Sequence, residues 1–88
     1  MSLQLICQLT TSDPARTQQA LLNDAEDQQN AGLSRLQIWT EEGAAALWLL
    51  FDVNDRAKAE AWLQRAQADT HGRPAAVTAS TAHFLRTA

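Results

Sequence analysis

The chain has 88 residues, of which 45% are apolar, and its formal net charge is −3 at pH 7. This length and composition are typical of a folded domain and exclude a disordered chain, so we predict one domain over residues 1–88. The seven Lys and Arg residues are scattered and are outnumbered by ten Asp and Glu residues. Because surfaces that bind nucleic acid or anionic lipid are basic, we expect neither nucleic acid nor membrane as a partner.

The cysteine content and the apolar runs bear on the cellular location. Cys7 is the single cysteine, which excludes an intrachain disulfide and a CxxC motif. Its place in an alternating apolar run predicts a small buried side chain rather than a reactive thiol. The longest apolar run, residues 44–51, is too short to cross a bilayer, and the N-terminus shows no signal-peptide pattern. We expect a cytoplasmic protein.

The first third of the chain predicts a strand followed by a helix. Apolar residues occupy alternate positions in residues 3–9, which is typical of a strand with one buried face. Asp13 is a good N-cap and Pro14 suits the first helical position, so we predict a helix from 14 to about 31. Gly32 is placed to end it.

The middle of the chain predicts a β-hairpin, with strands at 35–41 and 44–53 and a two-residue turn at Glu42 and Gly43. The second of these strands is almost wholly apolar, which is typical of a central strand. The predicted register collects the aliphatic side chains on one face and both tryptophans on the other. Its pairs are Trp39 with Ala46, Gln37 with Trp48, Ile38 with Leu47 and Leu36 with Leu49.

The last third predicts a second helix and an edge strand. We expect Asn54 to cap a helix that runs to about residue 69 and ends before Gly72 and Pro74. Residues 75–82 form a weak fourth strand, which suits a sheet edge. Residues 83–85 are expected to be a short tail that docks on the domain.

The order strand, helix, hairpin, helix, strand predicts an α+β, ferredoxin-like β-α-β-β-α-β fold. Right-handed crossovers place both helices on one face of a four-stranded antiparallel sheet. The expected core is the apolar set on that face together with the apolar stripes of the helices. Its members are Leu3, Leu5, Cys7, Leu9, Leu21, Leu22, Leu36, Ile38, Leu47, Leu49, Phe51, Trp62 and Leu63.

This topology leaves the second sheet face without helices. By alternation that face carries Gln4, Ile6, Gln8, Gln37, Trp39, Ala46, Trp48 and Leu50. An apolar patch of this kind is at the upper limit of what monomers expose. We predict that it packs against the same face of a second copy, giving a homodimer. The alternative is a monomer whose C-terminal tail covers the patch.

The stretch GAAALWLLFDVNDRAKAEAWL, residues 43–63, resembles two families of the dimeric α+β barrel superfamily. One is the YCII-related family, in which a Gly-led apolar strand runs into an acidic turn and a helix. The other is the muconolactone isomerase family, whose central strand ends in a similar FDV phrase. The resemblance implies a dimer of two such sheets packed face to face.

The same resemblance carries over no catalytic residue. YCII-related proteins have a His/Asp pair and an Asp-Pro after the second helix. Here the first strand has no His, and Gln64 to Gln67 stand where the Asp-Pro would be. No His or Asn pair of the haem-binding or quinol-oxidising relatives is identifiable, so no cofactor is expected.

Several side chains are candidates for a ligand site. Trp39 and Trp48 could line a cavity between two sheets, with Gln4, Gln8 and Gln37 as polar anchors, or could simply fill the dimer interface. Arg35, expected on the tryptophan face, is the candidate for binding an acid. His83 could transfer protons inside the barrel or lie on the surface, and we expect His71 to be solvated.

Other polar clusters have simpler interpretations. Asp52, Asn54 and Asp55 could hold a metal, but their spacing fits a helix N-terminus better, so no metal site is expected. Glu41 and Glu42 are expected to be solvated. No P-loop, GxGxxG, GxSxG or HExxH motif is present in the sequence.

Two functions of different classes therefore follow. The first is a homodimer of undetermined biochemical role that uses its open sheet face for assembly and for a small-molecule ligand. The second is a cofactor-free isomerase or monooxygenase acting on a small cyclic or aromatic acid inside the barrel. A ligand sensor is a third option, and whether the protein is an enzyme stays open.

Overall fold

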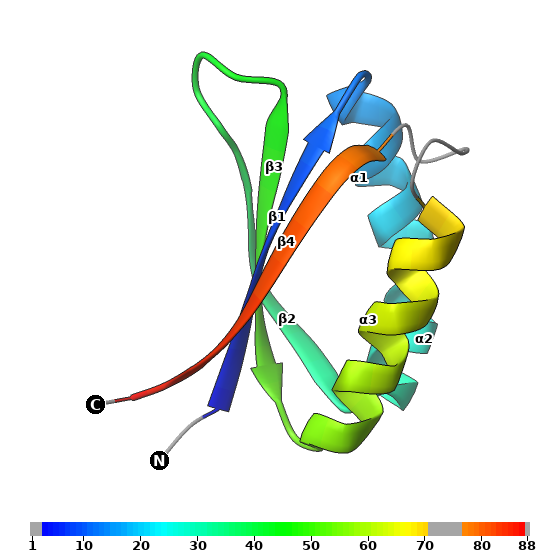
Figure 1. The fold of residues 1–88 in the computed structure, drawn as a ribbon, viewed down its shortest axis with the longest axis vertical. Coiled ribbons are helices and arrows are strands. Elements are labelled where there is room, and N and C mark those ends of the chain that lie inside the picture. Colours follow the sequence, from blue (N-terminus) through cyan, green and yellow to red (C-terminus); the bar gives the residue numbers. More distant parts are fainter. Residues whose placement is uncertain (1–2, 71–76, 88) are drawn as a thin grey trace.

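The computed structural model describes residues 3–70 and 77–87 as a four-stranded antiparallel sheet with helices on one side. Figure 1 shows the helices stacked along one face, while the other face of the sheet carries no helix among the described residues. The strand order is β2-β3-β1-β4. The elements are β1 (Leu3–Thr11), α1 (Pro14–Asn23), α2 (Ala25–Asn30), β2 (Leu33–Thr40), β3 (Ala46–Val53), α3 (Arg56–Thr70) and β4 (Val77–Arg86).

The ferredoxin-like topology predicted from the sequence is confirmed. Strand β3 lies between β1 and β2 and is antiparallel to both, so β1 and β2 are parallel strands separated by a third. Strand β1 separates β3 from β4 in the same way. Each crossover then passes over the same side of the sheet, which is why the helices form one layer.

The core lies between that helix layer and the sheet. Leu5, Leu49 and Phe51 are almost completely buried on the helix side. Phe51 meets the ring of Trp62 from α3 edge to face, with ring centroids 5.8 Å apart. Most of the predicted core is confirmed, but Leu36 and Leu22 are wrong, because they are 50% and 42% exposed. Other members of the buried set are Ala31, Leu33, Ala59 and Val77.

The predicted continuous first helix is instead two helices that meet at Asp24. Asp13 caps α1 as predicted, with its side chain accepting from the backbone N–H of Arg16 at 3.2 Å. Asn and Asp residues favour helix ends over helix interiors, and residues 23 and 24 are of those types. The buried Gln28 side chain donates to the carbonyl oxygen of Leu21 at 3.3 Å and so stabilises the break.

The entrance to α3 differs from the prediction by one residue. Asp55, and not Asn54, caps the helix, because its carboxylate accepts from the backbone N–H of Lys58 at 3.1 Å. The backbone N–H of Asn54 instead donates to the carbonyl oxygen of Gly32 at 2.7 Å. Gly32 ends α2 with a φ of 74°, as its type and position predict.

The predicted hairpin register is wrong by two residues. The backbone N–H of Glu41 donates to the carbonyl oxygen of Ala46 at 2.9 Å, so the loop spans residues 42–45 rather than a two-residue turn. Trp39 therefore pairs with Trp48. An even shift leaves the side chains of residues 37–40 on their predicted faces, which is why the separation of aliphatic and tryptophan faces holds there.

Strand β2 also contains an irregularity that the sequence pattern did not indicate. The register shifts between Arg35 and Gln37, which leaves Leu36 as an extra residue without a partner on β3. A bulge of this kind turns the side chains before it to the opposite face from that predicted. This explains why Leu36 is exposed and why Leu33 is buried instead.

The C-terminal segment is a strand rather than a docked tail. Strand β4 continues to Arg86, and residues 83–86 pair with β1, so the segment does not fold over the open side of the sheet. The edge position of the fourth strand is confirmed.

The expectations for His71, Gly72, Pro74 and residues 75–76 lie outside the described residues. Over the described ranges, no helix is long and apolar enough to span a membrane.

Candidate functional site

The side of the sheet opposite the helices, here called the open face, carries two central rows of side chains. The strand registers define these rows in the order β4, β1, β3, β2. The first row is His83, Ile6, Leu50 and Gln37, and the second is Thr81, Gln8, Trp48 and Trp39. Ile6, Leu50, Trp48 and Trp39 are thus neighbours, and this apolar group reaches the β2 edge of the sheet. Gln8 lies beside it on the central strand β1.

The open face remains partly exposed in the isolated chain. Trp39 is 42% exposed, Leu85 is 47% exposed, and Ile6, Trp48 and Leu50 are only half-buried. Ala46, predicted to share this face, is buried. The face is therefore a continuous apolar surface with nothing among the described residues lying over its centre.

A polar cluster lies at the tryptophan end of the open face. The indole N–H of Trp48 donates to Glu41 Oε1 at 2.6 Å, and the side-chain amide of Gln8 donates to the same oxygen at 3.3 Å. Glu41 is half-buried, so the expectation that it is solvated is wrong. Its carboxylate holds the Trp48 ring in place and has two donors that offset its desolvation.

The structure brings together four of the five predicted ligand-site residues and separates the fifth. Gln37, Trp39, Trp48 and His83 lie on the open face. Arg35 pairs with the fully buried Phe51, which places it on the helix-covered face, so its predicted position beside the tryptophans is wrong. The physical reason is the bulge at residue 36, which inverts the faces of the residues before it.

The geometry does not give His83 a catalytic partner on its own sheet. Its cross-strand neighbours in the row are Ile6 and then Leu50, which are apolar. Glu41 follows β2 at the opposite edge of the sheet. An acid–base pair requires hydrogen-bond distance, so the enzyme alternative stays a prediction without an assigned pair.

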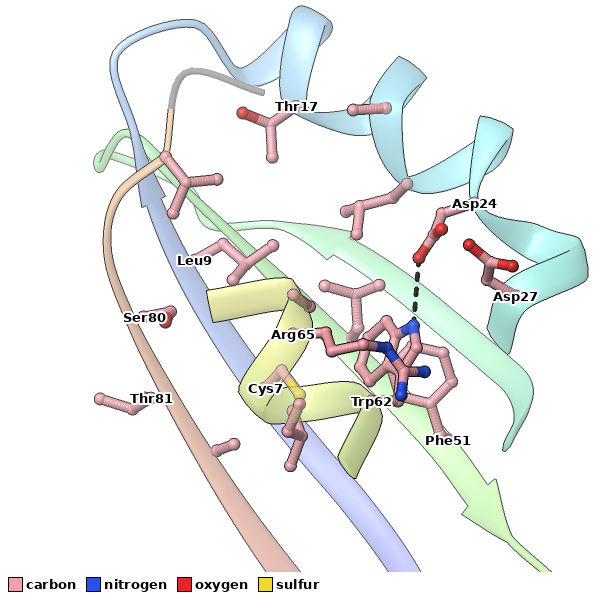
Figure 2. A pocket seen from close by; sticks show the side chains of 17 residues that line it. Cys7, Leu9, Thr17, Asp24, Asp27, Phe51, Trp62, Arg65, Ser80 and Thr81 are labelled. Carbon is pink, nitrogen blue, oxygen red and sulfur yellow. Dashed lines mark hydrogen bonds between the residues drawn. The ribbon is translucent and has the colours of Figure 1, made fainter. Parts of the chain in front are cut away.

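A second candidate site lies on the other side of the sheet, as a cavity of about 230 Å³ between the sheet and the helices. Figure 2 shows its walls, with Leu9 and Cys7 from β1, Thr17 from α1 and Trp62 from α3. Eleven of its 17 lining residues are apolar. The space is partly open to solvent, because Asp27, Arg65 and Thr81 in its lining are exposed, so it is a pocket between the two layers rather than a closed void.

The polar end of this cavity is formed by residues from α2, from α3 and from the junction between α1 and α2. Asp24 Oδ2 accepts from the indole N–H of Trp62 at 3.2 Å, and Figure 2 shows Asp27 and Arg65 beside this pair. Burial raises the pKa of Asp24, and its hydrogen bond to Asp27 and the negative charge there raise it further. The Trp62 hydrogen bond and the positive charge of Arg65 act in the opposite direction.

Two further expectations concern Cys7 and the acidic residues. Cys7 is buried as predicted, and burial raises the pKa of its thiol to about 12. Asp52 and Asp55 diverge, since Asp52 pairs with Gln4 on the open face while Asp55 caps α3. Within the part of the chain that the structure describes, no three His, Cys, Asp or Glu residues lie close enough to hold a metal ion.

No pattern in the sequence predicts the cavity. Asp24 and Asp27 lie in a segment that reads as a solvated helix surface, and Trp62 was assigned to the core. Only a helix break at residue 24 orients that carboxyl group toward an indole 38 positions later. The poor helix propensity of Asn23 and Asp24 was the one available signal.

The fold is shared with solved structures of low sequence identity. An uncharacterized NIPSNAP domain protein from Burkholderia xenovorans superposes with a TM-score of 0.63 and 12% identity, covering 98% of this chain and 94% of that one. A dimeric ferredoxin-like protein from an uncultured marine organism has a TM-score of 0.54 and 9% identity, covering 94% and 84%. A second dimeric ferredoxin-like protein from such a source has a TM-score of 0.52 and 9% identity, covering 99% and 97%.

These similarities show that the chain has the ferredoxin-like α+β fold. The sequence matches no protein-family profile and no curated protein. The fold class is therefore established by the structure, while the function rests on the two candidate sites.

Proposed function

We propose that the protein acts as a homodimer in which the open faces of two chains pack together. One observation carries this proposal, namely the continuous apolar surface of Ile6, Leu50, Trp48 and Trp39 on a sheet face that none of the described helices covers. The two marine ferredoxin-like proteins of the same fold are dimeric, which supports self-association here.

The energetics favour a second copy as the occupant. Burial of apolar surface contributes about 25 cal/mol per Å², and aromatic side chains dominate such contacts. The carboxylate of Glu41 already accepts two hydrogen bonds within its own chain, and these neutral donors offset part of the cost of desolvating it at an interface. A chain of 88 residues buries only about two-thirds of its unfolded surface, so association would also raise its stability.

We further propose that the dimer binds a small molecule between its two sheets. Two facing sheets would bring Trp39, Trp48, Gln37 and His83 of each chain to the space between them. Aromatic walls with a few amide and imidazole groups suit a small planar molecule. Arg35 is not part of this proposed site, because it lies on the other face.

The test is the solution mass, measured by light scattering on the wild type and on two matched variants. Trp39 and Leu22 are each 42% exposed, but Trp39 lies on the open face and Leu22 on α1. We expect a wild-type mass of about twice 9.7 kDa, a Trp39→Glu variant of monomer mass, and a Leu22→Glu variant that remains dimeric. Far-UV circular dichroism checks that each variant is folded.

Two results would overturn the proposal. One is a monomeric wild type over about a hundredfold range of concentration. The other is a folded Trp39→Glu variant that keeps the dimer mass, which would place the interface elsewhere.

A further inference from the structure

The cavity on the helix side of the sheet is large enough for a ligand and differs from the packed core around it. Its volume is about 230 Å³. For comparison, an engineered apolar cavity of about 150 Å³ binds benzene. The present space therefore accommodates a single aromatic ring with a short side chain.

The apolar lining residues determine which kind of ligand body fits this cavity. The rings of Phe51 and Trp62 meet edge to face on one side, and Leu9, Leu21 and Leu49 contribute aliphatic surface. Because apolar surface and aromatic ring edges favour an aromatic guest, a phenyl or similar ring is the expected body. Cys7 adds no reactive group, since its buried thiol is uncharged.

The charged residues at the polar end of the cavity determine which head group the ligand should carry. Two carboxyl groups, Asp24 and Asp27, and one guanidinium, Arg65, line that end, so acidic groups outnumber basic ones. Asp24 has one oxygen engaged by the indole N–H of Trp62. A positively charged donor would offset the repulsion between Asp24 and Asp27, whereas a carboxylate would add to it.

We propose that this cavity binds a small aromatic amine, with its ring between the sheet and α3 and its ammonium group on Asp24. Asp24 is the residue that determines the preference for a cation, and Trp62 orients it through the hydrogen bond. This site lies within one chain, on the opposite side of the sheet from the proposed dimer interface, so it does not depend on dimerisation.

The first experiment compares three probes that share the same phenyl-alkyl body, namely 2-phenylethylamine, ethylbenzene and 3-phenylpropionate. Each is titrated into the wild-type protein and followed by proton–nitrogen NMR, with the Trp62 indole N–H as the local reporter. We expect saturable shifts with the amine and at least ~10-fold tighter binding of the amine than of the carboxylate. Asp24→Asn should reduce that ratio toward one while leaving ethylbenzene binding unchanged.

A matched pair of substitutions on α3 tests the location. Ala66 lines the cavity, whereas Ala57 is exposed and does not. Ala66→Phe fills the space and should abolish binding of the amine, while Ala57→Phe should bind as the wild type does. If Ala66→Phe fails to fold, nuclear Overhauser contacts between the bound amine and the rings of Phe51 and Trp62 in the wild type replace it.

The proposal is overturned by any one of four results, of which three come from the titrations. These are the absence of saturable shifts with the amine, equal or tighter binding of 3-phenylpropionate, and full binding by a folded Ala66→Phe variant. Absence of the ring contacts in the wild type would have the same consequence.

Discussion

The two faces of the sheet are built from alternate residues of the same strands, but they differ in how far the chain itself buries them. On the helix-covered face, Leu5, Leu49 and Phe51 are buried within one chain. On the open face, Trp39 and Trp48 carry apolar surface that the described helices do not cover. The difference teaches that crossover handedness, and not hydrophobicity, decides which face is completed within the chain.

The two faces also differ in how they accommodate polar groups. The open face places Glu41 where two side-chain donors meet it. The helix-covered face encloses Asp24 against one indole N–H and leaves a cavity beside it. The first arrangement suits closure by another surface, and the second suits a ligand.

The largest expected effect is on the core of the helix-covered face. Phe51→Ala removes a completely buried ring and its contact with Trp62, which should lower the free energy of unfolding by about 3–5 kcal/mol. A chain of this size has a total stability of roughly 4–13 kcal/mol, so the loss is a large fraction of it. Urea denaturation followed by circular dichroism measures the change.

The control for this prediction is the half-exposed Leu36 at the bulge of β2. Leu36→Ala should cost no more than about 1 kcal/mol. Equal losses in the two variants would show that burial does not separate these positions as the structure describes.

An intermediate effect is expected at the two glycines with positive φ. Gly32 and Gly43 have φ values of 74° and 80°, but a Cβ on Gly32 would lie 3.1 Å from the backbone nitrogen of Asp55, whereas a Cβ on Gly43 would meet nothing within 4 Å. Gly43→Ala should therefore cost about 1 kcal/mol from backbone strain alone, and Gly32→Ala roughly 2–3 kcal/mol. Thermal denaturation of both variants tests the order, and a larger loss at Gly43 would contradict it.

The smallest effect is a pH dependence that arises at the cavity. Burial raises the pKa of Asp24 above its ordinary 3.8, so the folded state holds this proton more tightly than the unfolded state. The stability that this proton contributes is fully present below pH 3.8 and is lost as the pH rises through the pKa of the folded state. The charges facing this group are Asp27 on α2 and Arg65 on α3.

Asp24→Asn removes the titration but keeps an oxygen for the Trp62 N–H. The stability of the variant relative to the wild type should therefore increase as the pH rises above 3.8 and then become constant. Urea denaturation at a series of pH values measures this difference. A difference that falls with rising pH would show that Asp24 is stabilised, rather than destabilised, in its charged form.

Much of the fold was predictable because local patterns agree with the tertiary arrangement. Alternation assigned the faces of β1 and β3, and Asp13, Pro14 and Gly32 marked real helix ends. For the candidate site on the open face, the sequence predicted which side of the sheet it occupies but not its full set of residues. Trp39 and Trp48 were assigned to it correctly, while Arg35 was assigned to the wrong side because a bulge has no periodic signature.

The sequence by itself determined the order of elements, the segregation of aliphatic and tryptophan side chains, and the burial of Cys7. These depend on period, capping and turn chemistry, which act over a few residues. Only the tertiary structure decided the loop length at residues 42–45, the break at Asp24, and the cavity between α3 and the sheet. These features involve contacts between distant segments, such as Trp62 with Asp24 and Thr11 with Ala45.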